Sequence, residues 1–562
     1  MNFSLPLHLR RRHLTAALLA SAIFSTPAMA ALDDAKAILQ VLLNKGVITQ
    51  SDYDKTLEEW NSKPLDSVSP VQFVQDALGV QAKDVQKAVE YAKKDEKNGS
   101  VKPSGYGWVS ADGEKSANLI GLVHFDTRNI SNGLSDSADK DSASGASNYE
   151  VRRARIGLNG SIAKDLDYEI LTNLVGSSPN LIHRAYINYG YNKNAQFRVG
   201  RFKQPFSLEE MTSANATDFQ ERSYGNQLVA SQRLGVMVFG EPTKGFTYAI
   251  SSYQDGFNEL SNTTNAGTLG IGRATVNFAE LNNISDSVLH FGVGIDKGRY
   301  ETTPTTSTDT GTTASSYTRA TIVSLRSEDR GLSNAYRAQI AGDFVTAGYG
   351  VQANNNASIT KDLKGLEVAL AKGAFKFQAE TFDSSYSASS RNYDSVNAVD
   401  YGTTNYDIKA KTNYFEFIYN LTGENWSNSY KSGAFTTVKP KANFSSGTGG
   451  GLGAWQLGIR LSNYEISEPT VVATKSDGQV VARSFAKINS NASWNSRGEN
   501  SEKAQTITYG LNWILNPNSR VILNYAVTKF DRAVTYLTTT TPATLGTTDL
   551  EKVISIRTQI NF

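Results

Sequence analysis

The sequence predicts an all-β fold, a transmembrane antiparallel β-barrel, and its last ten residues show why. In a strand, side chains alternate between two faces with period two. One face of 553–562 is apolar: Ile554, Ile556, Ile560 and Phe562. The other face is polar: Ser555, Arg557, Gln559 and Asn561. A barrel in a membrane satisfies both faces, because lipid contacts the outer face and water fills the lumen. A long alternating strand that ends on an aromatic residue is also more typical of such a barrel than of a soluble protein.

The same alternation recurs from about residue 119 onward. Apolar positions, many of them aromatic, alternate with positions that carry Arg, Lys, Glu or amides in 154–162, 375–381, 455–462, 507–513 and 521–527. A soluble β-sandwich would also alternate, because one face of each of its sheets is buried. The aromatic apolar faces and the charged opposite faces favour the membrane barrel.

The connections between these segments alternate in length. Residues 161–167 and 516–518 predict tight turns, whereas 131–147, 302–317 and 381–404 predict long polar loops. Short periplasmic turns and long external loops are typical of outer-membrane barrels. If the chain enters the barrel from the periplasm and its last strand returns there, the number of strands is even.

The N-terminus predicts a signal peptide over residues 1–30. A basic stretch, Arg10–Arg12, precedes the apolar residues 14–24 and an Ala28-Met29-Ala30 cleavage site. The apolar stretch is too short to span a bilayer as a helix, and the alternative is an uncleaved interfacial anchor. Export leads to an oxidising compartment, but the chain has no Cys. A disulfide scaffold and a thiolate metal site are therefore excluded.

Residues 31–104 predict a short α-helical periplasmic region before a barrel at 115–562. A first helix has Leu32, Ala35, Leu39 and Leu42 at helical spacing and ends at Asn44-Lys45-Gly46. A second helix is capped by Ser51 or Asp52 and runs to Trp60, and a third runs from Val71 to about Glu96. The alternative for this region is a flexible spacer.

Charge, hydropathy and histidine content exclude several functions. Without Arg10–Arg12 the chain has 53 basic and 54 acidic residues, so nothing in its net charge predicts nucleic-acid binding. Mean hydropathy is −0.37 and no run of eighteen apolar residues follows the leader, so only a barrel could span a membrane. The remaining histidines, His124, His183 and His290, lie in no zinc or nucleophile–base spacing. We therefore expect no catalytic residue, no metal and no cofactor.

Several motifs in the predicted barrel resemble the phosphate-selective porin O and P family of Gram-negative outer membranes. They lie at 152–160, 185–189, 199–209, 219–223, 421–424, 433–435, 453–460, 510–517 and 557–562. The resemblance implies a barrel of about 16 strands that assembles as a homotrimer in the outer membrane. It also implies the passage of small anions such as phosphate along a lumenal arginine ladder, whose paired arginines match Arg152 and Arg153.

The alternation of the strands predicts which arginines face the lumen. These are Arg153, Arg155, Arg184, Arg198 and Arg233, whereas Arg152 falls on the opposite face, near the external mouth. The alternative is an ordinary lumen wall in which arginines pair with Glu169 or Glu380. The phosphate-specific members of the family carry Arg at three alternating positions in one strand. This chain has no Arg-x-Arg-x-Arg, so the resemblance does not extend to strict phosphate selectivity.

The segment that follows the fifth strand, 202–232, is a candidate constriction loop. The candidate residues of this segment are charged: Lys203, Glu209, Glu210, Asp218, Glu221 and Arg222. Arg201, at the end of the preceding strand, is a further candidate. Charges of both signs across a narrow opening would filter solutes by charge and size. The alternative is that these charges pair with one another, Glu221 with Arg222 above all, and brace the loop.

The sequence thus predicts a passive outer-membrane porin, not an enzyme, that prefers small anions. Its partners would be outer-membrane lipid, anions such as phosphate, and two further copies of the chain. A channel for other small solutes such as short amides is the first alternative. An outer-membrane enzyme or receptor barrel is the second, but the N-terminal region does not resemble the plug of an energised importer.

Overall fold

The computed structural model describes most of the chain after residue 101 and little of it before. The described residues are 39, 43, 49–61, 102–104, 106–110, 112–131, 148–175, 181–255, 267–302, 305–308, 316–331, 335–341, 357–394, 399–447, 450–467, 470–474, 477–484, 501–537 and 545–562. The predicted signal peptide and third helix lie outside them, as does the first helix apart from two residues. The chain divides into one unit of 1–119 with 159–164 and a second of 120–158 with 165–562.

The first unit contains a helix where the second N-terminal helix was predicted. Helix α3 spans Gln50–Asn61. Its cap is Thr49 and not Ser51 or Asp52, because the Thr49 hydroxyl accepts a hydrogen bond from Asp52 N (3.3 Å) and the Asp52 carboxylate accepts one from Thr49 N (2.9 Å). Strands β1 (Lys102–Ser104) and β2 (Gly107–Val109) form a hairpin in the same unit.

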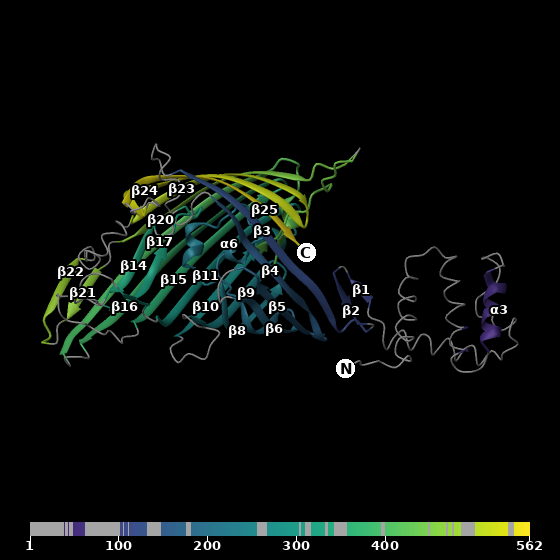
Figure 1. Ribbon diagram of the computed structural model, residues 1–562, viewed down its shortest axis with the longest axis horizontal. Coiled ribbons are helices and arrows are strands. Elements are labelled where there is room, and N and C mark those ends of the chain that lie inside the picture. The colour runs from purple at the N-terminus through teal and green to yellow at the C-terminus, as the bar shows by residue number, and fades with distance from the viewer. Residues whose placement is uncertain are drawn as a thin grey trace, which may run out of the picture. The chain divides into compact units, whose positions relative to one another are not determined.

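Sixteen long antiparallel strands of the described residues close into a barrel (Figure 1). They are β3 (Ser116–Ser131), β4 (Asn148–Ala163), β5 (Leu166–Asn173), β6 (Ile182–Asn192), β7 (Ala195–Lys203), β8 (Gln232–Thr243), β9 (Phe246–Asp255), β10 (Gly267–Asn277), β11 (Ser287–Thr302), β15 (Ala357–Lys372), β16 (Phe375–Asp394), β17 (Val399–Asn420), β20 (Ala454–Ile466), β23 (Lys503–Asn516), β24 (Ser519–Leu537) and β25 (Leu545–Asn561). β25 pairs with β3, with Ser555 opposite Arg128, so no sheet edge stays open. The predicted fold class and strand number are confirmed.

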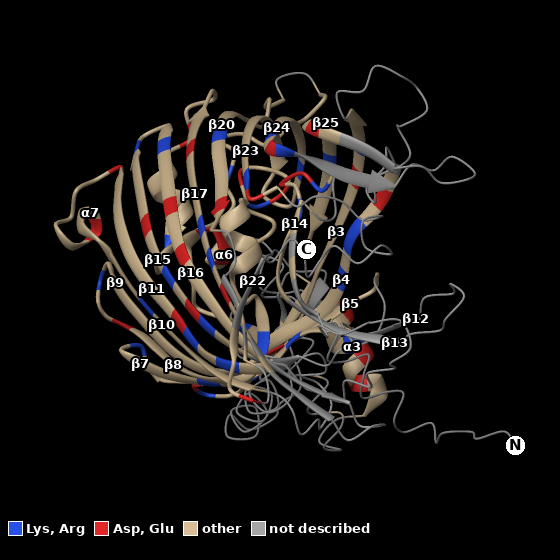
Figure 2. Ribbon diagram, turned by 90° about the vertical axis from the view of Figure 1, so that its left-hand side faces the viewer, with Lys and Arg blue, Asp and Glu red and all other residues tan. Residues whose placement is uncertain are grey.

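Three connections fold into the barrel interior. The first, 204–231, contains helix α6 (Leu208–Met211) and the 3₁₀ turn η2 (Tyr224–Leu228), and Figure 2 shows α6 inside the ring of strands. The second contains β13 (Ser316–Leu325) and β14 (Tyr336–Ala341), which form a small sheet with β12 (Thr305–Thr308). The third, 421–453, contains η3 (Trp426–Ser429) and the hairpin of β18 (Tyr430–Lys431) and β19 (Ala434–Phe435).

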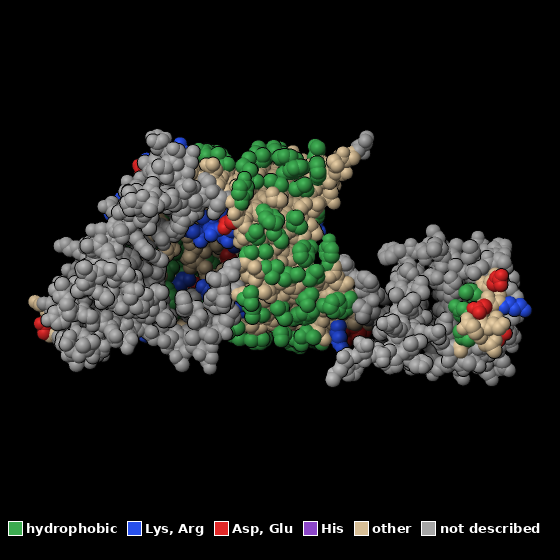
Figure 3. Space-filling model, in the orientation of Figure 1, with side chains coloured by type: hydrophobic (Ala, Val, Ile, Leu, Met, Phe, Trp, Pro, Cys, Tyr) green, Lys and Arg blue, Asp and Glu red, His purple; other side chains and the backbone are tan. Residues whose placement is uncertain are grey.

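The predicted alternation is confirmed in the last strand. Ile554, Ile556 and Ile560 are 51%, 41% and 50% exposed, whereas the intervening Ser555, Arg557 and Gln559 are buried. On the face of the barrel that Figure 3 shows, hydrophobic side chains gather on the described part of the wall. The apolar faces therefore point outward and the charged faces point inward, as a membrane barrel requires. Among the described residues, no helix is long and apolar enough to cross a membrane.

The tight turns lie at one end of the barrel, which is the periplasmic end by the rule for such barrels. β4 ends at Ala163 and β5 begins at Leu166, and β23 ends at Asn516 and β24 begins at Ser519, as predicted. The prediction of a loop at 381–404 is wrong, because β16 and β17 occupy most of these residues. In that part of β16 the outward residues are polar, so no apolar face marked the strand. The periplasmic connection 421–453 is long, unlike its neighbours.

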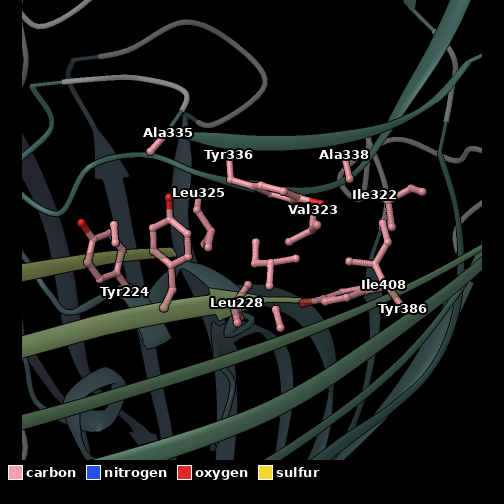
Figure 4. Close-up of a cluster of buried hydrophobic side chains, with 14 of the residues drawn as sticks. Tyr224, Leu228, Ile322, Val323, Leu325, Ala335, Tyr336, Ala338, Tyr386 and Ile408 are labelled. Carbon is pink, nitrogen blue, oxygen red and sulfur yellow. The ribbon is translucent and has the colours of Figure 1, made fainter. Parts of the chain in front are cut away.

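A hydrophobic cluster joins two of the interior segments to the wall near the external end (Figure 4). Tyr224 and Leu228 come from the first segment, and Leu325 and Tyr336 from β13 and β14. Wall residues of β15, β16, β17, β20, β23 and β24 complete the cluster, among them Ile359, Tyr386, Ile408, Tyr464, Ala504 and Phe530. Burial of this apolar surface holds the β13–β14 segment against the constriction segment.

Two short elements complete the fold: α7 (Phe278–Leu281) and the hairpin of β21 (Thr470–Thr474) and β22 (Val480–Ser484).

Candidate functional site

The candidate constriction loop 204–231 is a braced segment inside the barrel. Glu380 on β16 accepts hydrogen bonds from the backbone N–H groups of Leu208 (2.9 Å) and Glu209 (2.8 Å), at the start of α6. Glu380 therefore holds the segment, and no arginine among the described residues pairs with it. Ser207 caps the same turn through a hydrogen bond from Glu210 N (3.1 Å). These contacts fix where the segment enters the lumen.

Two wall arginines that the sequence analysis left out of the site hold the same segment. Arg460 on β20 lies 3.2 Å from the Glu209 carboxylate and donates to the Glu221 carbonyl oxygen at 2.9 Å. Arg557 on β25 forms two hydrogen bonds of 2.7 Å to Asp126 and lies 3.2 Å from Glu221. The alternation had put both arginines on the polar face of their strands. That signal predicted their direction but not their partners, which lie at least 132 residues away in the chain.

Glu221 is the charge centre of the constriction segment. Its carboxylate lies within 3.3 Å of Arg128, Arg152 and Arg557. Burial disfavours the ionised form, but the arginines outweigh it and hold the pKa of Glu221 well below its ordinary value. The alternative, that the charges of the segment pair with one another, holds for Arg222, but its partner is Glu210 at 3.3 Å and not Glu221.

Arg152 lies on the lumen side, which corrects its predicted position on the opposite face. Its Nε is 3.1 Å from Glu221, and its neighbour Arg153 also points inward. The outward residues of β4 change from Tyr149 and Val151 to Ile156 and Leu158. The period-two pattern therefore slips by one residue in this stretch, and two adjacent arginines reach the lumen.

The other constriction candidates are mostly structural braces. Lys203 donates to the carbonyl oxygens of Glu210 (2.6 Å) and Thr212 (3.3 Å), and Asp218 pairs with Lys376 on β16. Arg201 donates to the Ile182 carbonyl oxygen at 3.1 Å. Arg233 donates to the carbonyl of its neighbour Gln232 at 3.0 Å, and Gln232 rather than Arg233 lines the cavity described next.

A cavity of about 540 Å³ lies between the constriction segment and the wall formed by β4 to β10. Its charged lining is mostly basic. The cations are Arg153, Arg155, Arg184, Arg198, Lys203, Arg222 and Arg273, and the carboxylates are Glu210 and Glu241. Four of the five arginines predicted to face the lumen therefore meet in one space, with Arg233 outside it. Arg152, predicted on the opposite face, does not line this cavity either.

Three of these arginines contact only neutral groups among the described residues. Arg153 donates to the ring of His124 (3.3 Å), and Arg155 donates to the side-chain oxygen of Asn173 (2.9 Å). Arg198 donates to Asn188 (3.3 Å), and its guanidinium lies 4.3 Å from the centre of the Tyr186 ring. Their charge is therefore available to a solute.

Other cations of the lining are neutralised. Arg184 pairs with Glu169 at 3.0 Å, which confirms the alternative reading for that residue. Arg273 forms two hydrogen bonds to Glu367, at 2.7 and 2.8 Å.

A second cavity of about 160 Å³ adjoins the first on its external side. Both cavities are lined by Arg153, Ala214 and Arg222, so these residues mark the passage between them. Arg152, Arg326 and Arg557 complete the basic lining of the outer cavity, and Glu221 is its carboxylate. Basic side chains thus extend from the external side of the constriction to its periplasmic side.

The periplasmic connection 421–453 closes part of the inner cavity. Ser432, at the tip of the β18–β19 hairpin, lines it. Arg273 donates to the Gly433 carbonyl oxygen at 2.8 Å, and the Tyr430 hydroxyl lies 2.6 Å from Nδ1 of His290. His290 is fully buried, between the outward-facing Leu289 and Phe291 of β11.

The arrangement can attract anions. A guanidinium about 4 Å from an anion contributes about 4 kcal/mol at an effective dielectric constant near 20. A row of such groups lowers the entry barrier without forming one deep binding site, which conduction requires. No group of three or more His, Asp or Glu in the described residues could hold a metal ion.

The chain is similar to several known proteins. The family model for phosphate-selective porin O and P matches residues 120–562. Porin O of Pseudomonas aeruginosa is 25% identical over 406 residues, which cover 68% of this chain and 76% of that protein. Solved structures with some likeness include OmpT of Vibrio cholerae in its trimer form (9% identity, 80% of this chain and 100% of that one, TM-score 0.42) and an anion-selective porin from Comamonas acidovorans (11%, 80% and 100%, 0.41).

Proposed function

The chain belongs to the phosphate-selective porin O and P family, and on that premise we propose that its two basic cavities form the path of small anions across the membrane. As a member of the family it is a porin of the Gram-negative outer membrane. Transport through it is diffusion down a gradient, because a porin of this kind has no energy source.

One observation carries the proposal: the inner cavity presents arginines with no carboxylate partner. Arg153, Arg155 and Arg198 contact only neutral groups among the described residues, although Glu169 and Glu210 lie close enough to neutralise their neighbours Arg184 and Arg222. An anion entering this space gains attraction that a cation does not. Charge selectivity follows from which arginines are paired, more than from how many there are.

We infer a route from the shared lining of the cavities. An anion meets Arg152, Arg326 and Arg557 in the outer cavity and then Arg153 and Arg222 between the two. It leaves past Arg155 and Arg198 toward the periplasm. Each step exchanges one guanidinium for another, so no single site holds the anion strongly.

The solute class that this lining suits best is a small oxyanion such as phosphate. Guanidinium groups bind phosphate and carboxylate oxygens through paired N–H donors, which chloride cannot accept in the same geometry. The family description supports the same class. A channel that served short neutral amides would gain nothing from three unpaired arginines.

We also propose that the porin is a homotrimer, as the family resemblance implies. β5 and β7 have only 8 and 9 residues, whereas β17 has 22. A strand needs about 9–11 residues to span a bilayer. Their outward side chains Ile170, Phe197 and Val199 are 44% to 52% exposed and would be covered by a neighbouring copy. Cross-linking of the protein in detergent should give trimers, and a monomeric product would contradict this.

Reversal potentials of the purified protein in planar bilayers test the anion route. Under a potassium chloride gradient we expect an anion-selective potential, and millimolar phosphate added to both sides should reduce the chloride current. A cation-selective potential would overturn the proposal. An anion-selective current that phosphate leaves unchanged would keep the anion path and remove the oxyanion preference.

A further inference from the structure

The outer surface of the barrel changes from apolar to charged in successive rows of paired residues. One row across seven strands is wholly apolar: Ile507, Leu461, Phe415, Ala379, Val368, Phe291 and Val276. Two residues further toward the external end, the next row holds Gln505, Asn463, Asn413 and Thr381 before returning to Leu366 and Val293. The third row is charged: Lys503, Glu465, Lys411, Asp383 and Lys364. The charged row therefore borders the external edge of the apolar band.

A groove of about 750 Å³ opens on this surface across β9 to β17. Its apolar lining includes Ile250, Val293 and Leu366, which are 65%, 53% and 57% exposed. Gly272 on β10 keeps the groove open, because a Cβ there would meet only Ile295, at 3.5 Å. Its charged lining is Lys364, Asp383 and Lys411, which belong to the charged row, together with Arg273, whose charge is paired with Glu367 at 2.7 Å. The groove is thus apolar along its length and carries cations at its external end.

The lysines of the groove differ from others on the same surface, because no ion pair joins them to any residue that the structure describes. Lys503 pairs with Glu465 at 2.6 Å, and Lys297 pairs with Asp362 at 2.8 Å. Within the described residues neither Lys364 nor Lys411 forms an ion pair with Asp383, although Asp383 stands directly opposite both in the sheet register. Two lysines and one carboxylate leave a net positive charge at the groove.

We propose that this groove binds a phosphorylated lipid of the outer leaflet, with its phosphate against Lys364 and Lys411 and an acyl chain along Ile250, Val293 and Leu366. The two lysines lie two strands apart, about 10 Å by the usual strand spacing, so their flexible stems can reach one phosphate from both sides. An acyl chain matches the apolar groove, and a phosphate matches the net charge of its external end. A second copy of the chain would have to cover the unpaired lysines with new carboxylates.

The experiment measures binding of diphosphoryl lipid A to the full-length porin by native mass spectrometry in detergent. We expect bound lipid in the wild type and at least a tenfold loss of affinity in the double variant Lys364→Glu, Lys411→Glu. The matched control is Lys529→Glu, Lys552→Glu, which reverses two exposed lysines on β24 and β25, away from the groove. Its affinity for lipid A should stay within twofold of wild type.

A second variant tests the groove without changing charge. Gly272→Phe would place a ring in the open space above Ile295 and should lower lipid A affinity at least fivefold while the conductance stays unchanged. Equal lipid A binding by the wild type, the charge-reversed groove and the filled groove would overturn the proposal. So would variants that bind lipid A normally but dissociate the oligomer, since the groove would then be a subunit contact. Anion selectivity is unaffected by either result, so failure here is distinct from failure of the anion route.

Discussion

Two walls of this barrel carry basic side chains on their inner faces and use them in opposite ways. On β4 and β7, Arg153, Arg155 and Arg198 contact only neutral groups among the described residues. On β20 and β25, Arg460 and Arg557 are bound to carboxylates of the segments that fold inward and of the wall itself. The first wall presents its charge to the lumen, whereas the charge of the second wall holds the interior segments in place.

The comparison shows that an arginine can face the lumen without being available to a solute. All five side chains follow from period-two alternation, yet only the pairing distinguishes a conducting surface from a structural one. A buried ion pair is costly to break because the partner left behind stays charged in a low dielectric. Removing an arginine should therefore affect stability on one wall and selectivity on the other.

The largest expected effect comes from Arg460→Met. This change leaves Glu209 and Glu328 buried without their cation, at distances of 3.2 and 2.5 Å from the lost guanidinium. Loss of one partner of a buried pair costs about 3–5 kcal/mol. Equilibrium unfolding in guanidinium chloride with the refolded porin should show that loss.

The matched control for this prediction is Arg155→Met on the opposite wall. It removes a partly exposed arginine that has no carboxylate partner in the described chain, so stability should change by less than about 1 kcal/mol. Equal losses in the two variants would show that the two walls do not differ as described.

The next effect is on selectivity. Arg153→Glu with Arg155→Glu reverses two charges at the inner cavity, and the ratio of anion to cation permeability should fall about tenfold or more, because each charge contributes up to about 4 kcal/mol near an anion. Reversal potentials in a potassium chloride gradient measure the ratio. Arg153→Lys with Arg155→Lys keeps the charge and should keep most of the chloride preference. If ion preference stays at the wild-type value in the Glu variant, these side chains do not line the path.

Period-two alternation predicted the barrel and the inward faces of most strands, because lipid and water impose opposite demands on the two faces of each strand. It failed at Arg152, where the pattern slips by one residue, and at 381–404, where strands continue beyond the apolar band and lose their apolar face. Both failures lie where the outward side chains no longer have to be apolar.

The pairing inside the lumen could not be read from the sequence. Glu380 holds the start of α6, 171 residues away in the chain, and Arg460 reaches Glu209 across 251 residues. Such contacts depend on how the interior segments cross the barrel, and no local period records that. The sequence therefore indicated which residues face inward, while the fold decides which of them are free.

A smaller effect concerns the periplasmic hairpin at the inner cavity. Gly433 has φ +77°, and a Cβ there would meet Thr275 Oγ1 at 2.8 Å. Gly433→Val should therefore displace the hairpin from Arg273, which now donates to the Gly433 carbonyl oxygen, and the single-channel conductance should rise. The control is Gly478→Val, at φ +84° with nothing within 4 Å, which carries the same backbone strain of about 1–2 kcal/mol but should leave conductance unchanged. An increase in both variants, or in neither, would exclude the hairpin as a restriction of the pore.

The smallest effect is a pH dependence of the second interior segment, in which Asp329 lies between β13 and β14. Burial, together with the neighbouring Glu328 and Glu221, raises the pKa of Asp329 to about 7, although Arg460 and Arg128 oppose the shift. A carboxyl group with a raised pKa favours the folded segment fully below its unfolded value of 3.8, and that contribution is lost as pH rises through 7. We therefore expect more frequent current fluctuations at pH 8 than at pH 5. Asp329→Asn should remove the difference, and equal fluctuations of the wild type at both pH values would show that Asp329 does not hold this segment.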